Sequence, residues 1–280
     1  MNSKILAFAT FLFLGSTAFS QSVKLSLGAG AKYEVITTMK MSSSANAMGQ
    51  TIETGMDNEN TELFDVKSVT TNNNELSAVL KRIKFNLSGM GQDMSYDSDN
   101  KESKGELAEA FGKKVGKPYQ VLYDDNGKVL NKDVVAEAKP EMPIPGAPAP
   151  SGKVELIDEI FIGKQLTNGY SWYDSTTTDV DKMKTTIKGT YKVLSVLNNN
   201  ATIMFEGIQQ QTGVMEQMGM ELNMSGTSNV TKEFLLDLKT GLIIQSNTKT
   251  KGTSNIEVMG TNIPVETDVT TTKKIKLVQN

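Results

Sequence analysis

Phe64-Asp65-Val66-Lys67-Ser68-Val69 is the stretch that decides the fold, because its pattern returns as Tyr191-Lys192-Val193-Leu194-Ser195-Val196. Both stretches read aromatic-x-Val-x-Ser-Val, and an Asn triplet that marks a turn follows each of them. The residues after each turn, Leu76 to Phe85 and Ala201 to Ile208, predict a second strand. We therefore expect the same β-hairpin twice in this chain.

Two further landmarks keep the same order around each hairpin. Gly30-Ala31-Lys32-Tyr33 precedes the first, and Gly169-Tyr170-Ser171-Trp172 precedes the second. An Asp/Gly turn between apolar strands closes each half, at Asp124 to Gly127 and at Asp237 to Gly241. Recurrence of three landmarks in one order favours an internal duplication over chance similarity of hairpins.

A Pro-rich stretch separates the two halves. Five of the seven prolines lie between Pro140 and Pro150, and such spacing favours an extended linker over a helix or a sheet interior. The N-terminus resembles a cleavable signal peptide, with Lys4, an apolar run from Ile5 to Gly15 and a cleavage site at Ala18-Phe19-Ser20. We divide the chain into a signal peptide (1–20), a first β half (21–138), a Pro-rich linker (139–150) and a second β half (151–280). The export signal predicts a periplasmic or secreted protein.

Two short helices are expected besides the strands. Ser103 to Glu106 forms a capping-box pattern ahead of an apolar stripe at Leu107 and Phe111. Ile157, Ile160 and Phe161 suggest a second helix before Gly163. The predicted fold class is mainly β: two similar antiparallel halves, forming a curved sheet or half-barrel, with one or two short helices and a Pro-rich crossover.

Composition disfavours several classes of function. The chain has no His and no Cys, which removes the Ser–His and Cys–His hydrolases, thiolate metal sites and disulfides. The net charge of −3 and the lack of a basic run disfavour nucleic-acid partners. No transmembrane segment is expected in the mature chain. The carboxylates Asp93, Asp97, Asp99, Asp124 and Asp125 lie in Asn/Gly/Ser-rich segments, where Asp is an ordinary turn residue. We expect no enzyme activity, no metal site and no cofactor.

The chain is unusually rich in methionine, with fifteen residues. Met39 and Met41 share one face of a first-half strand, and Met218, Met220, Leu222 and Met224 share one face of a second-half strand. Three interpretations remain open: filling of the core, an apolar or lipid-like ligand on a concave sheet face, and thioether binding of Cu(I). These six residues are the hypothetical ligand-binding set. Trp172 stands where Tyr33 stands in the first half, which favours packing over substrate contact.

The chain resembles a family of exported proteins of unknown function from Bacteroidota-type bacteria. The resemblance is carried by the signal ending Ala18-Phe19-Ser20-Gln21, the Gly-x-x-aromatic openings, the Tyr96-Asp97-Ser98 segment and the turn around Gly241. The layout of two halves is more distantly similar to periplasmic lipoprotein carriers, whose open half-barrels bind acyl chains. We expect a non-enzymatic envelope protein that binds an apolar ligand. An interaction module for protein or glycan, using Thr-, Asn- and Ser-rich loops, is the alternative, and an unrecognised carboxylate enzyme is third.

Overall fold

The structure is a computed structural model, and it describes residues 22–279 except 48, 90–92, 141–153, 155, 181, 218–219 and 259. Its eleven strands and two helices are β1 (Lys32–Ala47), β2 (Gln50–Val69), β3 (Asn73–Gly89), β4 (Met94–Asp97), α1 (Glu106–Gly112), β5 (Pro118–Asp124), α2 (Lys132–Ala138), β6 (Ser171–Val180), β7 (Met183–Leu197), β8 (Asn200–Gln217), β9 (Met220–Asp237), β10 (Ile243–Val258) and β11 (Thr261–Gln279). The predicted signal peptide and residues 141–150 of the predicted linker lie outside the described residues. Within them, neither helix is long and apolar enough to cross a membrane.

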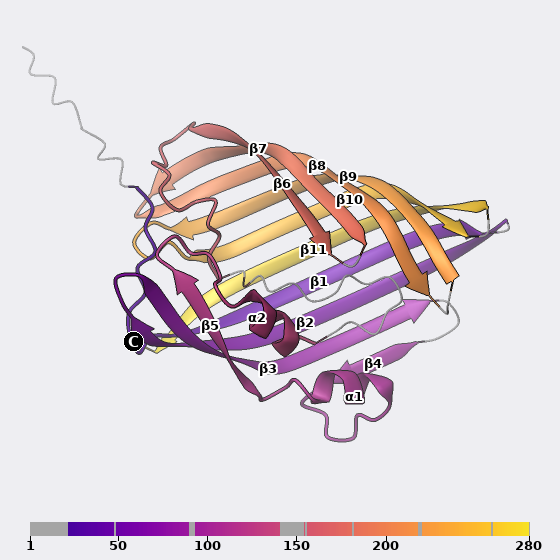
Figure 1. The fold of residues 1–280 in the computed structure, drawn as a ribbon, viewed down its shortest axis with the longest axis horizontal. Coiled ribbons are helices and arrows are strands. Elements are labelled where there is room, and N and C mark those ends of the chain that lie inside the picture. The colour runs from indigo at the N-terminus through magenta and orange to yellow at the C-terminus, as the bar shows by residue number, and fades with distance from the viewer. Residues whose placement is uncertain are drawn as a thin grey trace, which may run out of the picture.

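All eleven strands join one antiparallel sheet, so the mainly β prediction is confirmed. The order across the sheet is β4-β3-β2-β1-β11-β10-β9-β8-β7-β6, and β5 lies beside β3. Figure 1 shows the sheet curving around one face, with α1, α2 and the loops on that face. The two halves therefore form parts of one curved sheet, and the pairing of β1 with β11 joins the first half to the last strand.

The two predicted hairpins share their irregularities as well as their sequence. The β2–β3 register shifts between Val66 and Ser68, and the β7–β8 register shifts at the corresponding place, between Val193 and Ser195. A bulge inserts one residue and bends its strand, so a shared bulge gives both hairpins the same local bend.

The two openings also make the same backbone hydrogen bonds. Gly30 N–H donates to the Val66 carbonyl at 2.8 Å, and Gly169 N–H donates to the Val193 carbonyl at 2.9 Å. The two glycines adopt φ values of 85° and 81°, in the left-handed region where glycine carries no steric penalty. Each recurring motif thus occupies the same structural position in its half.

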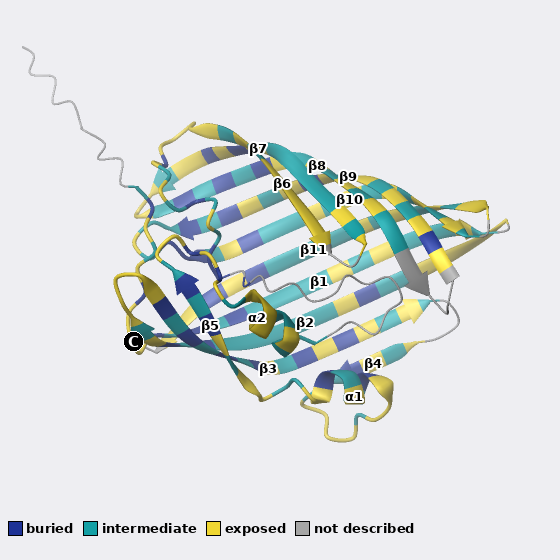
Figure 2. Ribbon diagram, viewed as in Figure 1, coloured by how far each residue is buried: buried dark blue, intermediate teal, exposed yellow. Residues whose placement is uncertain are grey.

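The sheet has two unlike faces. Paired residues on antiparallel strands point to the same side, so the register assigns each side chain to a face. The concave face, which we call the inner face, carries Tyr33, Phe85 and Phe205, all buried. The residues between such positions along each strand form the outer face, and most of them are polar and exposed. Figure 2 shows this alternation as bands along the strands. The period of two in the sequence therefore separates an apolar interior from a polar exterior.

Three core clusters cover parts of the inner face. One, under α2 and the loop before β1, includes Phe64, Val66 and Tyr123; a second, under the loop around Phe161, includes Tyr191 and Ile203. The third lies under α1 at the β3–β4 edge and centres on Phe85, Phe111, Ile83, Tyr96, Leu107 and Met56. Phe111 contacts both Phe85 and Tyr96 with ring centroids 5.5 Å apart. The loops and α1 thus supply the second layer that a single sheet needs for a core.

The helix predictions are partly wrong. α1 forms at the expected place, but its N-cap is Gly105 without a side-chain cap, and Ser103 Oγ instead donates to the Asp97 carbonyl at 3.2 Å. Residues 158–163 form turns, closed by hydrogen bonds such as Phe161 N–H to the Asp158 carbonyl at 3.1 Å. The apolar spacing there reflects burial in the second core cluster. The second helix is α2 instead.

The shared openings make a quantitative prediction about stability. Gly30→Ala and Gly169→Ala should each lower the free energy of unfolding by about 1 kcal/mol, because alanine is strained at positive φ. Urea unfolding followed by circular dichroism measures the loss. Gly112→Ala is the matched control: an added Cβ there meets only the Tyr96 hydroxyl at an ordinary 3.7 Å, so stability should not fall. Losses that differ between Gly30 and Gly169 by 1 kcal/mol or more would show that the two openings are not structurally equivalent.

Candidate ligand-binding face

A row of methionine and leucine crosses the first half of the sheet on its inner face. Met94 pairs with Leu87, Leu87 pairs with Met56, and Met56 pairs with Met41. A pocket of about 330 Å³ opens at this row, and these four side chains line its apolar side. The other lining residues alternate with these four along the same strands or lie just before β4: Gly55, Asp57, Asn86, Ser88, Asp93 and Ser95. We call the four apolar residues the methionine row.

The predicted residues Met39 and Met41 both belong to this region. Each is half-buried and packs against the core cluster under α1, and Met41 lines the pocket directly. Flexible thioether side chains suit a surface that must fit more than one shape. These two residues therefore combine two of the interpretations left open by the sequence, since they pack on a core and also border a pocket.

The second-half residues of the predicted set lie on the same face but in another place. Met41 pairs with Val269, and the same row of the sheet crosses β9 at Val230, six residues from Met224, or about 20 Å along the strand. Met224 is half-buried and Leu222 is buried. Met218 and the side chain of Met220 lie outside the described residues. Met39 and Met41 therefore lie on the same face as Leu222 and Met224, without forming one patch with them.

Two rows of polar side chains cross the inner face next to the methionine row. The first row pairs Asn60 with Thr37, Thr37 with Lys273, and Lys273 with Ser246. The second row runs from Asn58 through Met39, Thr271 and Thr248 to Lys232. We call the polar members of these rows the polar band: Asn58, Asn60, Thr37, Lys273, Thr271, Ser246, Thr248 and Lys232.

The polar band is shielded from solvent to an unusual degree. Lys273 is 3% exposed and Ser246 is 8% exposed, and Lys232 is half-buried with its Nζ 5.5 Å from the centroid of the Phe205 ring. The band could not be predicted from the sequence, because its members come from five strands. In the sequence, the only sign of the band is a single lysine among the uncharged residues that share its face, on β9 and again on β11.

Trp172 takes the packing role that the sequence predicted. Its ring stacks on Tyr191 with centroids 4.9 Å apart and an interplanar angle of 7°, and Phe161 meets it edge-on at 6.3 Å. Burial raises the pKa of the Tyr191 hydroxyl, and the charges of Asp158 and Asp174 add to the shift. Tyr191 therefore stays protonated, and the cluster is a core of aromatic contacts.

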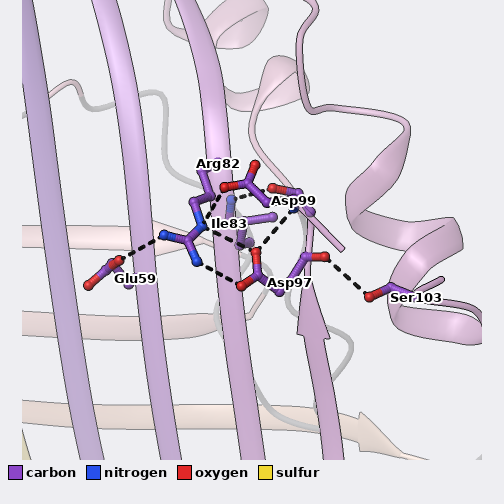
Figure 3. Close-up of polar contacts among 7 residues, drawn as sticks. Glu59, Arg82, Ile83, Asp97, Asp99 and Ser103 are labelled. Atoms are coloured by element: carbon purple, nitrogen blue, oxygen red, sulfur yellow. Dashed lines mark hydrogen bonds and ion pairs between the residues drawn. The ribbon is translucent and has the colours of Figure 1, made fainter. Parts of the chain in front are cut away.

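Arg82 organises the acidic segment that follows β3. Its Nη2 lies 2.7 Å from an Asp97 carboxylate oxygen, and its Nε lies 3.1 Å from one of Asp99. Glu59 on β2 lies 3.9 Å from Nη1. Figure 3 shows Arg82 between Glu59 and the two aspartates. The hydrogen bond from Arg82 holds the pKa of the Asp97 carboxyl below its ordinary value of 3.8. Asp97 and Asp99 therefore anchor the β4 edge, and within the described residues no cluster of acidic side chains is arranged to hold a metal ion.

Comparisons with known proteins give a family match over part of the chain. Residues 153–243 match a family of unknown function (DUF6263). This agrees with the expected resemblance to a family without an assigned function. No curated protein matches the chain.

Among solved structures, the chain is similar to lipovitellin, in a structure titled for its lipid–protein interactions, with a TM-score of 0.48 and 11% identity. That likeness covers 91% of this chain and 26% of lipovitellin, so the chain spans about a quarter of that protein. An outer membrane channel from Pseudomonas putida F1 gives a TM-score of 0.33 at 10% identity, over 90% of this chain and 97% of the channel. The attachment invasion locus protein of Yersinia pestis gives 0.19 at 6% identity, over 88% and 99%.

The Arg82–Asp97 pair predicts an acid-dependent loss of stability. Because the pKa of Asp97 is lower in the folded chain than in the unfolded chain, the pair stabilises the fold fully above pH 3.8, and this contribution is lost as pH falls toward the folded pKa. In Arg82→Met this part of the acid dependence should disappear. Urea midpoints between pH 2.5 and pH 6 measure it.

Lys81→Met is the control for that experiment, because it removes the neighbouring exposed charge on the same strand. The control should keep the wild-type acid dependence. An Arg82→Met profile parallel to that of the wild type below pH 4 would rule out the assigned role of the pair.

Proposed function

We propose that this protein is a non-enzymatic envelope protein that binds an apolar, lipid-like ligand on the inner face of its curved sheet. The observation that carries the proposal is the pocket along the methionine row. Met41, Met56 and Met94 come from three different strands, and the sheet register aligns them on one side of a space of about 330 Å³. A volume in this range suits a small ligand or one segment of a longer chain.

The surface beyond the pocket supports the same proposal. The inner-face positions of β10 and β11 past the polar band are half-buried, and they carry small or apolar side chains such as Thr250, Val265 and Val269. Their outer-face neighbours, such as Lys251 and Asp268, are exposed and charged. An apolar molecule therefore meets a suitable surface on only one side of this sheet.

A second candidate function rests on the edge strand β6. Three runs of Thr lie on strands, at Thr176 to Thr178 on β6, Thr185-Thr186 on β7 and Thr270 to Thr272 on β11. β6 pairs only with β7 in the described sheet, and Tyr173 on its outer face is 65% exposed. An open edge can accept an extended segment of a partner, so an interaction module for protein or glycan would use this strand.

Replacement of one pocket methionine tests the ligand proposal. Delipidated protein is titrated with a fluorescent fatty acid, and Met41→Gln should weaken binding roughly tenfold, which corresponds to the ~1.4 kcal/mol expected for losing one apolar contact surface. Met204→Gln is the matched control, because Met204 is half-buried on the outer face of β8 and its substitution should leave the affinity unchanged.

Thermal unfolding of both variants should show intact folds, since each substitution is nearly isosteric. Absence of saturable binding to the wild-type protein would remove the proposal. Equal weakening by the two substitutions would place the ligand somewhere other than the inner face.

A further inference from the structure

The two edges of the sheet differ in how their backbone groups are used. At one edge, the Leu122 N–H of β5 donates to the Asn131 side chain at 2.9 Å, and the Leu130 N–H donates to the Leu122 carbonyl at 2.8 Å. β4, which flanks β3 further along, has only four residues. At the other edge, no described group outside β7 forms a backbone hydrogen bond with β6. Of these two edges, β6 is therefore the open one.

Half of the residues of β6 direct their backbone N–H and C=O groups away from β7. In an antiparallel pair, these groups point toward the partner strand and away from it on alternate residues. The Val193 N–H donates to the Tyr170 carbonyl at 2.8 Å, and the β6–β7 pairing then continues without a register shift to Val180. The even-numbered residues of β6 therefore bond to β7. The free groups belong to Ser171, Tyr173, Ser175, Thr177 and Asp179.

The second part of β6 is uncovered on both faces of the sheet. Residues 175–179 are all exposed, although Thr176 and Thr178 hold inner-face positions, which are half-buried on the central strands. The strand also has no proline, no lysine and no bulge, which are features that commonly block further pairing at a sheet edge. This edge is thus able to add a strand.

The charges of β6 are all negative. Asp174 lies on its inner face and Asp179 on its outer face, and the strand has no basic residue. Neither carboxylate forms an ion pair with a described residue, and Asp174 accepts a hydrogen bond from the Thr176 hydroxyl at 3.1 Å. On its paired side, β6 meets three lysines of β7, and one of them, Lys184, lies opposite Asp179. The sheet itself thus shows that β6 pairs with a lysine-bearing strand.

We propose that β6 is a docking edge that binds an extended, lysine- or arginine-bearing segment of a protein partner as a further strand of the sheet. The inference rests on the second candidate function above and is independent of the apolar ligand. Backbone hydrogen bonds at the free positions hold the segment, and its cations lie beside Asp174 and Asp179. A second copy of β6 fits less well, because it would add two carboxylates and no cation to the same interface.

The test uses a synthetic peptide with the sequence of residues 183–192, which carries the three lysines of β7. The labelled peptide is titrated with the protein, and its fluorescence anisotropy should show saturable binding. A matched peptide with glutamate at the three lysine positions should bind at least tenfold more weakly, because its charges repel those of β6.

Ser175→Pro tests whether the peptide adds as a strand. Proline removes the N–H that points away from β7, so it blocks pairing on the free side and keeps the bonds to β7. The affinity for the lysine peptide should fall at least tenfold in Ser175→Pro and change less than twofold in Ser175→Ala, which keeps the N–H. Thermal unfolding of both variants checks the fold. Asp179→Asn is a second variant that leaves the backbone alone, and it should weaken binding of the lysine peptide about threefold.

The outcomes separate the edge from the class of its partner. Unchanged affinity in a folded Ser175→Pro, or no binding of the lysine peptide to the wild-type protein, would overturn docking at β6. Equal binding of the lysine and glutamate peptides, lost in Ser175→Pro, would keep the interaction edge and overturn the cationic partner. A dimer in sedimentation experiments that is lost in Ser175→Pro would make a second copy the occupant. Fatty-acid binding should be the same in Ser175→Pro and wild-type protein, and a loss of it would contradict the independence of the two sites.

Discussion

The pairing of β1 with β11 is the constraint on which the rest of the structure depends. It joins residues 32–45 to residues 265–279. The first and the last strand along the chain therefore lie side by side in the middle of the sheet. Because side chains alternate with a period of two, a slip of one residue in this ladder would put Met39 and Met41 on the opposite face of the sheet from Lys273. The pairing also spans almost the whole described chain, and such non-local contacts form slowly during folding. The inner face is therefore completed only when the last strand is in place.

The two halves differ where the first has an insertion. In the second half, one long strand, β9, pairs with the whole of β8, from Asn200 to Gln217. In the first half the corresponding side of β3 pairs with two short strands, β4 at its far end and β5 at its near end, and α1 lies between them in the chain. A short, interrupted edge accepts further strands poorly, so this break ends the sheet. The same break places α1 over Phe85 and forms one wall of the region that holds the methionine row.

Local patterns predicted what depends on neighbours in the chain and missed what depends on register. The hairpins, their Asn turns and the Gly30 and Gly169 openings could be predicted, since each is decided within a few residues. The helix expected near Ile157 does not form, because burial in a loop gave the same apolar spacing as a helix face. Met39 and Met41 share a face as alternation predicts, but the position of Met224 relative to them depends on the register of four strands. The Arg82–Asp97 ion pair could not be predicted for the same reason, because the pairing of β3 with β4 brings the two side chains together.

The position of the polar band follows from how stability is distributed over the inner face. Burying polar side chains costs free energy even when they are paired, so a sheet tolerates them where nearby packing is strong. Here two aromatic and aliphatic cores cover the end of the sheet below the band, and the Phe85–Phe111 cluster supports its other side under α1. The band therefore separates the two cores at one end of the sheet from the cluster under α1, so the inner face is packed as three regions and not as one continuous core.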